Sequence, residues 1–486
     1  MNRFLLLSFL IFGCQNLSVN NEEFPILATI GDRIITERDF KNRSEYTIRP
    51  AYCKGNLYYH KKIILNNLIA EKLLALEAQK LELSPGTKAL NNFIKGRKEQ
   101  AMRQLLFHKE GFLKVDLTKD EINHYFKMAG RKYDISYFSF PGGEFADSVN
   151  SAIYNGLSLD QIYTSAFNGK MPRKDVLWTD SNDELINSKL FISPQVEKGQ
   201  IMGPMKMNDG SGFIMKINGW NDSMPLSQKS IDERIETVTN TLKERKAIVI
   251  FSEFISETMK GKSIQLNKEI FPKYAESIGK KYFTGKEDKE SALSKALFGD
   301  TEILQIDNLK PRDEEFEDLP LFDINGEIWT VKKFEKELSS HPLVFRKRKM
   351  SNEEFPNQFR LAIVDFIQDY YLTKRAYEMD LDIDKSILLN EQLWSDSFFA
   401  FQYAIAKLEG ISSFENKHTE LKPYIDELQS KYNSIINIDM DLFEEITISN
   451  IDMFATQGNV PYPVIVPSFP SFTDDSYIDY GSLINK

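Results

Sequence analysis

The feature that most constrains the fold is a short pattern that occurs twice along the chain. Residues 26–40 (ILATIGDRIITERDF) predict a strand, a Gly-Asp turn, a second strand and a helix that begins after Thr36. Residues 321–334 (LFDINGEIWTVKKF) have the same order, with an Asn-Gly turn and Thr330 before the helix. We therefore expect two related units in the chain.

A long amphipathic helix is expected after each copy of the pattern. The two helices have six matching positions, all separated by 298 residues: Ile69, Glu71, Leu74, Ala78, Leu81 and Leu83 match Ile367, Asp369, Leu372, Ala376, Met379 and Leu381. Helical spacing alone produces some matches by chance. Together with the preceding turn and threonine, however, the constant separation favours an internal duplication.

The two units are also expected to end alike. Residues 227–258 predict a long helix, followed by Gly261 and a short strand at 264–266. Its expected apolar face consists of Ile231, Ile235, Val238, Leu242, Ile248, Phe251 and Ile255. In the second unit, helices are expected at 385–408 and 419–432, and a strand at 436–438. Each unit is thus predicted to be mostly helical, with a small sheet made from its own first and last segments.

Only the first unit contains an extra segment, residues 132–220. It predicts a strand at 133–140, a helix at 144–155, and a second helix from Asp160 after Gly156. A short helix near 183–191, a Gly-Pro turn and a final strand follow. Alternating elements over about 90 residues are enough for one small domain.

Three motifs in this segment resemble the parvulin-type peptidyl-prolyl isomerase chaperones of the bacterial envelope, the PpiC, SurA and PrsA group. They are residues 156–162, the turn-like stretch 197–204 (EKGQIMGP), and the last strand 212–217 (GFIMKI). The resemblance covers about residues 25–275 and implies a helical chaperone core with an inserted parvulin domain. It gives the fold class as α+β and mostly helical, with a SurA-like core and a second, partial copy of that core.

The sequence departs from this family at the residues that carry its chemistry. Family parvulins have two facing histidines, and Tyr137 and Ile214 stand at the expected positions. With Met202 and Phe213 they form a vestigial site, so we expect weak or no isomerase activity and a domain that packs or docks peptides. An active isomerase with Tyr137 in a rearranged site is the alternative.

The N-terminus resembles a bacterial lipoprotein signal. Arg3 precedes a short apolar run at 4–12, which is too short to span a bilayer. Ile11-Phe12-Gly13-Cys14 is similar to a lipoprotein processing site, which implies cleavage before Cys14 and its acylation. Gln15 resembles the outer-membrane sorting position of some diderm bacteria. We expect a chain on the periplasmic side of the envelope, held by a lipid anchor, in the outer membrane rather than the inner one.

These expectations divide the chain into eight parts. They are a signal peptide (1–13), a lipidated tether (14–24), the first segment of the chaperone core (25–131), the degenerate parvulin-like domain (132–220), a core-completing helix and strand (221–275), a linker (276–320), a second SurA-like helical domain (321–455), and a Pro-rich extended tail (456–486).

Composition excludes several other functions. The chain has 61 basic and 71 acidic residues and a net charge of −10, which argues against a nucleic-acid partner. Five scattered histidines, expected at the surface, show no metal-ligand spacing, so no metal or cofactor is expected. Cys53 has no disulfide partner if Cys14 carries a lipid, and we interpret it as a half-buried small residue.

Apolar side chains are the remaining candidates for binding. The chain has 35 Phe, 20 Tyr and 14 Met, which suit varied partners. The densest cluster consists of Phe398, Phe399, Phe401 and Tyr403. The proline-containing tail either packs along the body or is presented to a partner. The sequence thus favours a lipid-anchored chaperone or foldase for unfolded and newly exported proteins; a structural lipoprotein subunit of an envelope assembly is the other alternative.

Overall fold

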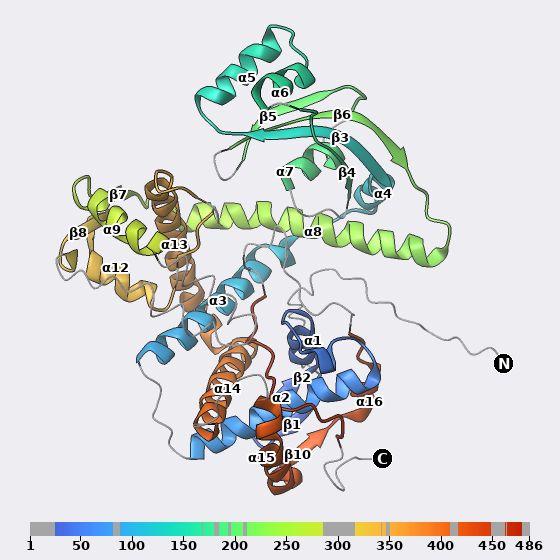
Figure 1. Cartoon of the computed structure of the whole chain (residues 1–486), viewed down its shortest axis with the longest axis vertical. Helices are drawn as coiled ribbons and strands as arrows, with labels where there is room; N and C mark the ends of the chain where they lie inside the picture. The colour runs from blue at the N-terminus through green and yellow to red at the C-terminus, as the bar shows by residue number, and fades with distance from the viewer. Residues whose placement is uncertain are drawn as a thin grey trace.

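The computed structural model shows a mostly helical chain with three small antiparallel sheets, as expected for the α+β class (Figure 1). It describes residues 25–80, 88–167, 169–178, 184–192, 196–207, 211–284, 316–341, 343–346, 350–408, 417–448, 462 and 464–478. The predicted signal peptide, Cys14 and the tether lie outside these residues. No helix in the described part of the chain is long and apolar enough to cross a membrane.

Both copies of the strand-turn-strand-helix pattern form as predicted, and a long helix follows each. Met379 and Leu381, predicted on the second long helix, lie beyond its end, and their counterparts Leu81 and Leu83 lie outside the described residues. The first contains β1 (Ile26–Ile30), β2 (Arg33–Thr36), α1 (Glu37–Glu45) and the long α2 (Tyr58–Lys80). The second contains β8 (Pro320–Ile324), β9 (Glu327–Thr330), α12 (Val331–Leu338) and the long α13 (Phe355–Glu378).

The threonines and turns have the predicted roles. Thr36 and Asp39 form a reciprocal capping box at α1, and the Thr330 hydroxyl accepts a hydrogen bond from the backbone of Lys333 at α12. The β8–β9 turn places Asn325 at φ 51° and Gly326 at φ 87°. Two successive left-handed residues match the right-handed twist of a hairpin, which explains the Asn-Gly pair.

The prediction that each unit closes its own sheet is wrong. β1 pairs with β10 (Ile436–Ile438) from the end of the chain, and β8 pairs with β7 (Ile264–Leu266) from the first half. The strand orders are β10-β1-β2 and β7-β8-β9. The two hairpins offer similar edges, so the local sequence does not decide which short strand completes which sheet.

Because of this crossed pairing, the folded units combine both halves of the sequence. The terminal module, defined by sheet β10-β1-β2, also contains α1, α2, α14 (Lys385–Lys407), α15 (Lys417–Tyr432) and α16 (Met440–Glu445). The central module, defined by sheet β7-β8-β9, contains α9 (Ile270–Thr284), α12 and α13. α9 continues to Thr284, into the range that was predicted to be a linker.

Two long helices join the modules. α3 (Lys88–Glu110) packs on α14 and α13, and α8 (Gln228–Thr258) lies across its end (Figure 1). Met102, Leu105, Phe251 and Leu372 share the core between them. The predicted apolar face of α8 is only partly used, since Ile235 is 40% exposed.

The extra segment forms a separate layer on α8, the inserted domain (Figure 1). α4 (Lys119–Met128) leads into a four-stranded antiparallel sheet of order β4-β3-β6-β5. Its elements in chain order are β3 (Arg131–Phe140), α5 (Glu144–Tyr154), α6 (Leu159–Phe167), β4 (Arg173–Leu177), α7 (Glu184–Asn187), a helical turn (Ser188–Ile192), β5 (Ile201–Lys206) and β6 (Gly212–Asp222). The Gly203-Pro204 pair, predicted to be a turn, lies within β5 at an irregularity in its pairing with β6.

Candidate functional site

The four residues of the predicted vestigial site do not share one face of the inserted sheet. Tyr137 on β3 pairs with Met215 on β6, whereas Phe138 pairs with Ile214. Successive side chains of a strand point to opposite faces. Ile214 is therefore fully buried with α5 and α6, and the prediction that it faces Tyr137 is wrong.

Tyr137, Met202 and Phe213 do lie together on the opposite face, beside Met205. The rings of Tyr137 and Phe213 have centroids 5.8 Å apart, and Met205 pairs with Phe213 across β5 and β6. Phe213 is buried in the core of the inserted domain, and Tyr137, Met202 and Met205 are half-buried and pack against that core. We call these four residues the Tyr137 surface.

The polar groups at the Tyr137 surface include the hydroxyl of Tyr137 itself and the ammonium of Lys174. The Lys174 ammonium lies 5.0 Å from the Tyr137 ring centroid, and no described histidine or carboxylate bonds to the hydroxyl of Tyr137. Asp134 is engaged by Arg173 and Asn218, and the hydrogen bond from Arg173 is the main cause that lowers its pKa. The arrangement can hold an apolar side chain against an aromatic ring and flexible thioethers.

The second predicted binding cluster is largely part of a core. Tyr403 is 2% exposed and its hydroxyl contacts that of Tyr424, so it is not available to a partner. Phe398, Phe399 and Phe401 are half-buried, and Phe399 packs against the terminal module. Sequence reasoning placed these residues on a helix but did not identify the side covered by α15.

The histidines and Cys53 correct two further predictions. His60 and His108 are buried rather than at the surface, and His341 bonds to the carboxylate of Asp369 at 3.0 Å. Cys53 is fully rather than half buried. Among the described residues, no cluster of three or more His, Cys, Asp or Glu is placed to hold a metal ion.

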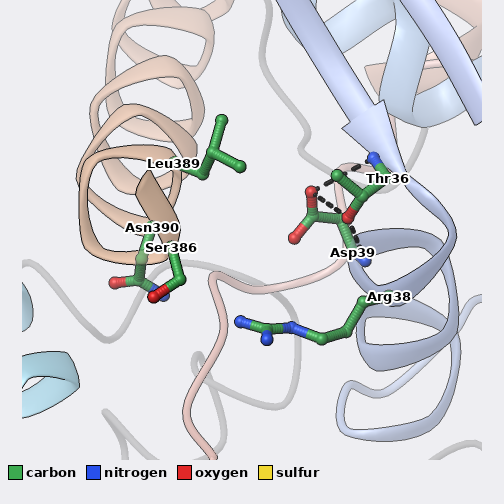
Figure 2. Close-up of a pocket in the computed structure, with 6 residues that line it drawn as sticks. All are labelled: Thr36, Arg38, Asp39, Ser386, Leu389 and Asn390. Carbon is green, nitrogen blue, oxygen red and sulfur yellow. Dashed lines mark hydrogen bonds between the residues drawn. The ribbon is translucent and has the colours of Figure 1, made fainter. Parts of the chain in front are cut away.

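A small polar pocket lies between α1 and α14 (Figure 2). It is lined by Thr36, Arg38, Asp39, Ser386, Leu389 and Asn390. Figure 2 shows Arg38 extending from α1 toward α14, and burial lowers its pKa. Thr36 and Asp39 are occupied by their mutual capping bonds, so these two residues are not free for chemistry at the pocket.

Buried charges that sequence reasoning did not assign hold the terminal module together. Asp396 on α14 accepts from Arg33 at 2.8 Å and from Lys72 at 3.0 Å. Arg43 on α1 makes two bonds to Glu71 on α2, at 3.1 and 2.8 Å. Glu71 and Lys72 lie on α2, which is buried on nearly every side, so both charges need buried partners.

The matched acids of the two long helices have related environments. Glu71 is held by Arg43, which also donates to the Ser468 carbonyl of the tail at 2.6 Å. Its counterpart Asp369 accepts from the hydroxyl of Tyr462, also in the tail, at 2.8 Å. Burial alone would raise the pKa of Asp369, but its bond to His341 and the charge of Arg103 lower it. In each module, therefore, hydrogen bonds link the matched acid to the C-terminal tail, through Arg43 at Glu71 and directly at Asp369.

The tail itself is extended, and it packs along the body. Residues 464–478 contain neither helix nor strand, as predicted. They lie on α2 and α15, where Phe469, Phe472 and Ile478 enter the core of the terminal module.

No protein-family model matches the chain, and none of the curated proteins matches it.

Proposed function

We propose that the chain is a chaperone of exported proteins, held at the bacterial outer membrane by a lipid on Cys14. In this proposal the inserted domain is a degenerate, parvulin-like peptide-docking module within a SurA-like helical body. Its mechanism is transient capture of unfolded segments on apolar surfaces, without a covalent step or a cofactor.

The observation that carries this proposal is the character of the Tyr137 surface. Half-buried methionines next to Tyr137 offer adaptable apolar contact to segments of different sequence. Isomerisation requires a barrier of about 18–20 kcal/mol to be lowered, and the described residues offer no polar pair for that purpose. Docking is the function that this surface supports best.

The architecture adds support. The inserted domain follows α4 and precedes α8, so it interrupts a helical body at the place that the resemblance implies. The strand at 133–140, the two helices after it and the final strand agree with the order expected from the sequence, whereas β4 and β5 were not expected.

An aggregation assay tests the proposal directly. The full chain is added in several-fold molar excess to an unfolded client, and light scattering is followed. We expect suppression by the wild type, clear loss of suppression with Met202→Ala and Met205→Ala combined, and no loss with Met224→Ala. Met224 is 77% exposed and lies outside the sheet, so it is the matched control. Absence of suppression by the wild type would contradict the chaperone proposal.

A protease-coupled assay with a proline peptide tests the catalytic alternative. We expect no rate above the uncatalysed reaction. Turnover that is lost in Tyr137→Phe would support an active isomerase with a rearranged site. Turnover that survives both Tyr137→Phe and Met202→Ala would place an activity outside the Tyr137 surface.

A further inference from the structure

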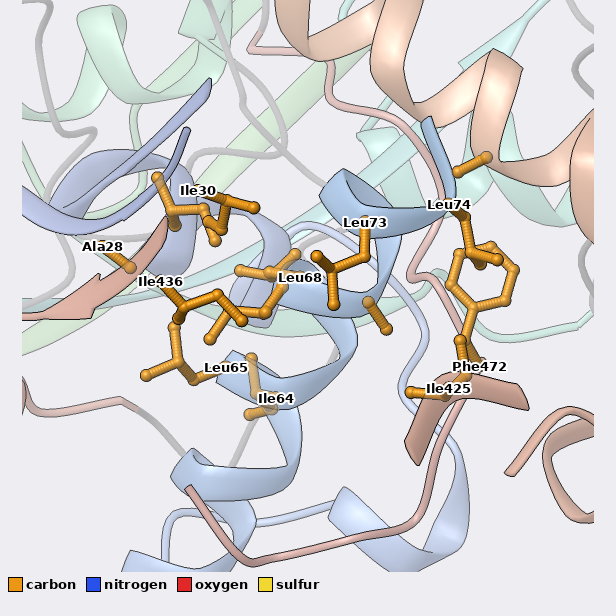
Figure 3. Close-up of a cluster of buried hydrophobic side chains, with 14 of the residues drawn as sticks. Ala28, Ile30, Ile64, Leu65, Leu68, Leu73, Leu74, Ile425, Ile436 and Phe472 are labelled. Carbon is orange, nitrogen blue, oxygen red and sulfur yellow. The ribbon is translucent and has the colours of Figure 1, made fainter. Parts of the chain in front are cut away.

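The terminal module already holds one extended polypeptide segment, its own tail. Residues 464–478 cross α2, and Phe469 and Phe472 insert among the residues of its core. Figure 3 shows Phe472 beside Leu74 and Ile425. The two aromatic side chains are three residues apart, and Pro470 lies between them.

The side chain of Asn67 on α2 forms hydrogen bonds to the backbone of the tail. Its side-chain oxygen accepts from the amides of Phe472 at 2.7 Å and Thr473 at 3.0 Å, and its nitrogen donates to the Thr473 carbonyl at 2.7 Å. One carboxamide thus satisfies donors and an acceptor as a neighbouring strand would. Such bonds do not depend on the identity of the tail side chains.

Asn66 and Arg43 extend the same mode of recognition. Asn66 donates to the carbonyls of Asp475 at 2.8 Å and Tyr477 at 2.6 Å, and Arg43 donates to that of Ser468. We call Arg43, Asn66, Asn67 and the adjoining core that receives the two phenylalanines the tail site. It combines backbone recognition with apolar sockets at a fixed spacing.

The polar floor of the tail site distinguishes it from an ordinary core. Arg43, Asn66 and Asn67 are each 0% exposed, and Glu71 is 1% exposed. A permanently buried region is more stable with apolar side chains, because buried polar groups gain little over their hydration. A floor of amides and a guanidinium can instead be hydrated when it is empty and satisfied by a peptide backbone when it is filled.

We propose that the tail site binds extended polypeptide segments with two aromatic side chains three residues apart, and that residues 464–478 occupy it until such a segment displaces them. This inference rests on the proposed chaperone function for the source of the segment, an unfolded client. The tail site would be a second binding site, in the terminal module, whereas the Tyr137 surface lies in the inserted domain. It replaces the cluster at 398–403 as the candidate binding site of the terminal module.

The first experiment weakens the tail in the full chain. A fluorescein-labelled peptide of residues 464–478 is titrated with the Phe469→Ala/Phe472→Ala variant, and fluorescence anisotropy is measured. We expect binding at least ten-fold tighter than to the wild type, whose site is filled. Tyr477→Ala is the matched control, because its ring is 78% exposed in the same segment, and it should behave as the wild type does. A labelled peptide with both phenylalanines replaced should bind at least ten-fold more weakly.

Hydrogen exchange of the wild-type chain tests the inference without a variant. The amides of Phe472 and Thr473, which donate to Asn67, should lose protection when reduced, carboxymethylated α-lactalbumin is added, while α2 stays protected. Exchange of these amides only together with α2 would show that the tail is a permanent part of the core and would overturn the inference, as would equal peptide binding by the variant and the wild type. The aggregation assay is read separately: peptide binding without suppression would refute the chaperone proposal and still support the site.

Discussion

His108 should make the stability of the helical body depend on pH. Its side chain is 4% exposed at the end of α3, where its ring stacks on Phe112 with centroids 5.4 Å apart. Burial, assisted by the charge of Lys109, lowers the pKa of His108 from 6.5 to about 4. The folded chain therefore favours the neutral imidazole, and protonation favours unfolding.

The size of the effect follows from these two pKa values. A lowered pKa means that the unfolded chain binds the proton more tightly, so the contribution to stability is complete above pH 6.5 and is lost as the pH falls toward 4. Linkage between these values gives a loss of about 2–3 kcal/mol at pH 4.5 relative to pH 7.5. Other ionisable groups also contribute to the pH dependence of stability. The prediction therefore concerns the difference in the free energy of unfolding between the wild type and His108→Gln.

Urea denaturation of the wild type and of His108→Gln, followed by circular dichroism at several pH values, measures that difference. The advantage of the wild type over the variant should fall by about 2–3 kcal/mol between pH 7.5 and 4.5. His124→Gln makes the same substitution at an exposed position on α4 and is the matched control. A constant difference between wild type and His108→Gln would refute the reasoning that burial suppresses protonation.

Three further predictions concern the architecture. Glu71→Ala should cost about 3–5 kcal/mol in denaturation experiments, because it leaves the guanidinium of Arg43 buried without its carboxylate. Gly96→Ala should destabilise the chain in thermal unfolding, although alanine favours helices, because its Cβ would lie 1.8 Å from the Ser340 carbonyl oxygen. When the chain is expressed as two fragments divided between α9 and β8, the fragments should co-purify, because sheet pairings in both modules cross the division; independent folding of each fragment would contradict the crossed topology.

Local patterns predicted most elements because they contain the reason for their own structure. Thr36 and Thr330 cap helices through their own hydroxyls, and Asn325-Gly326 adopts the turn that only such residues favour. The long helices α2, α8, α13 and α14 were recognisable from apolar spacing, whereas α3 was not predicted. These features depend on residues within a few positions of each other.

Strand pairing could not be predicted in the same way. The short strands at 264–266 and 436–438 each have three residues and similar apolar character, so either fits either hairpin. The choice depends on where α3 and α8 place the two modules, which is a property of the whole chain. The same limit explains the error at Ile214, since a one-residue change in register moves a side chain to the other face of the sheet.

The crossed pairing gives the two candidate binding surfaces different relations to the fold. The Tyr137 surface belongs to a domain inserted between α4 and α8, and its core is shared with Val238 and Leu242 of α8. The tail site belongs to the terminal module, which is complete only when β10 reaches β1. Since the tail follows β10 in the chain, its segment comes to the site only after both halves have been made and joined. The tail site is therefore completed at the same stage of folding as the segment that fills it, so any other segment must displace the tail in order to bind.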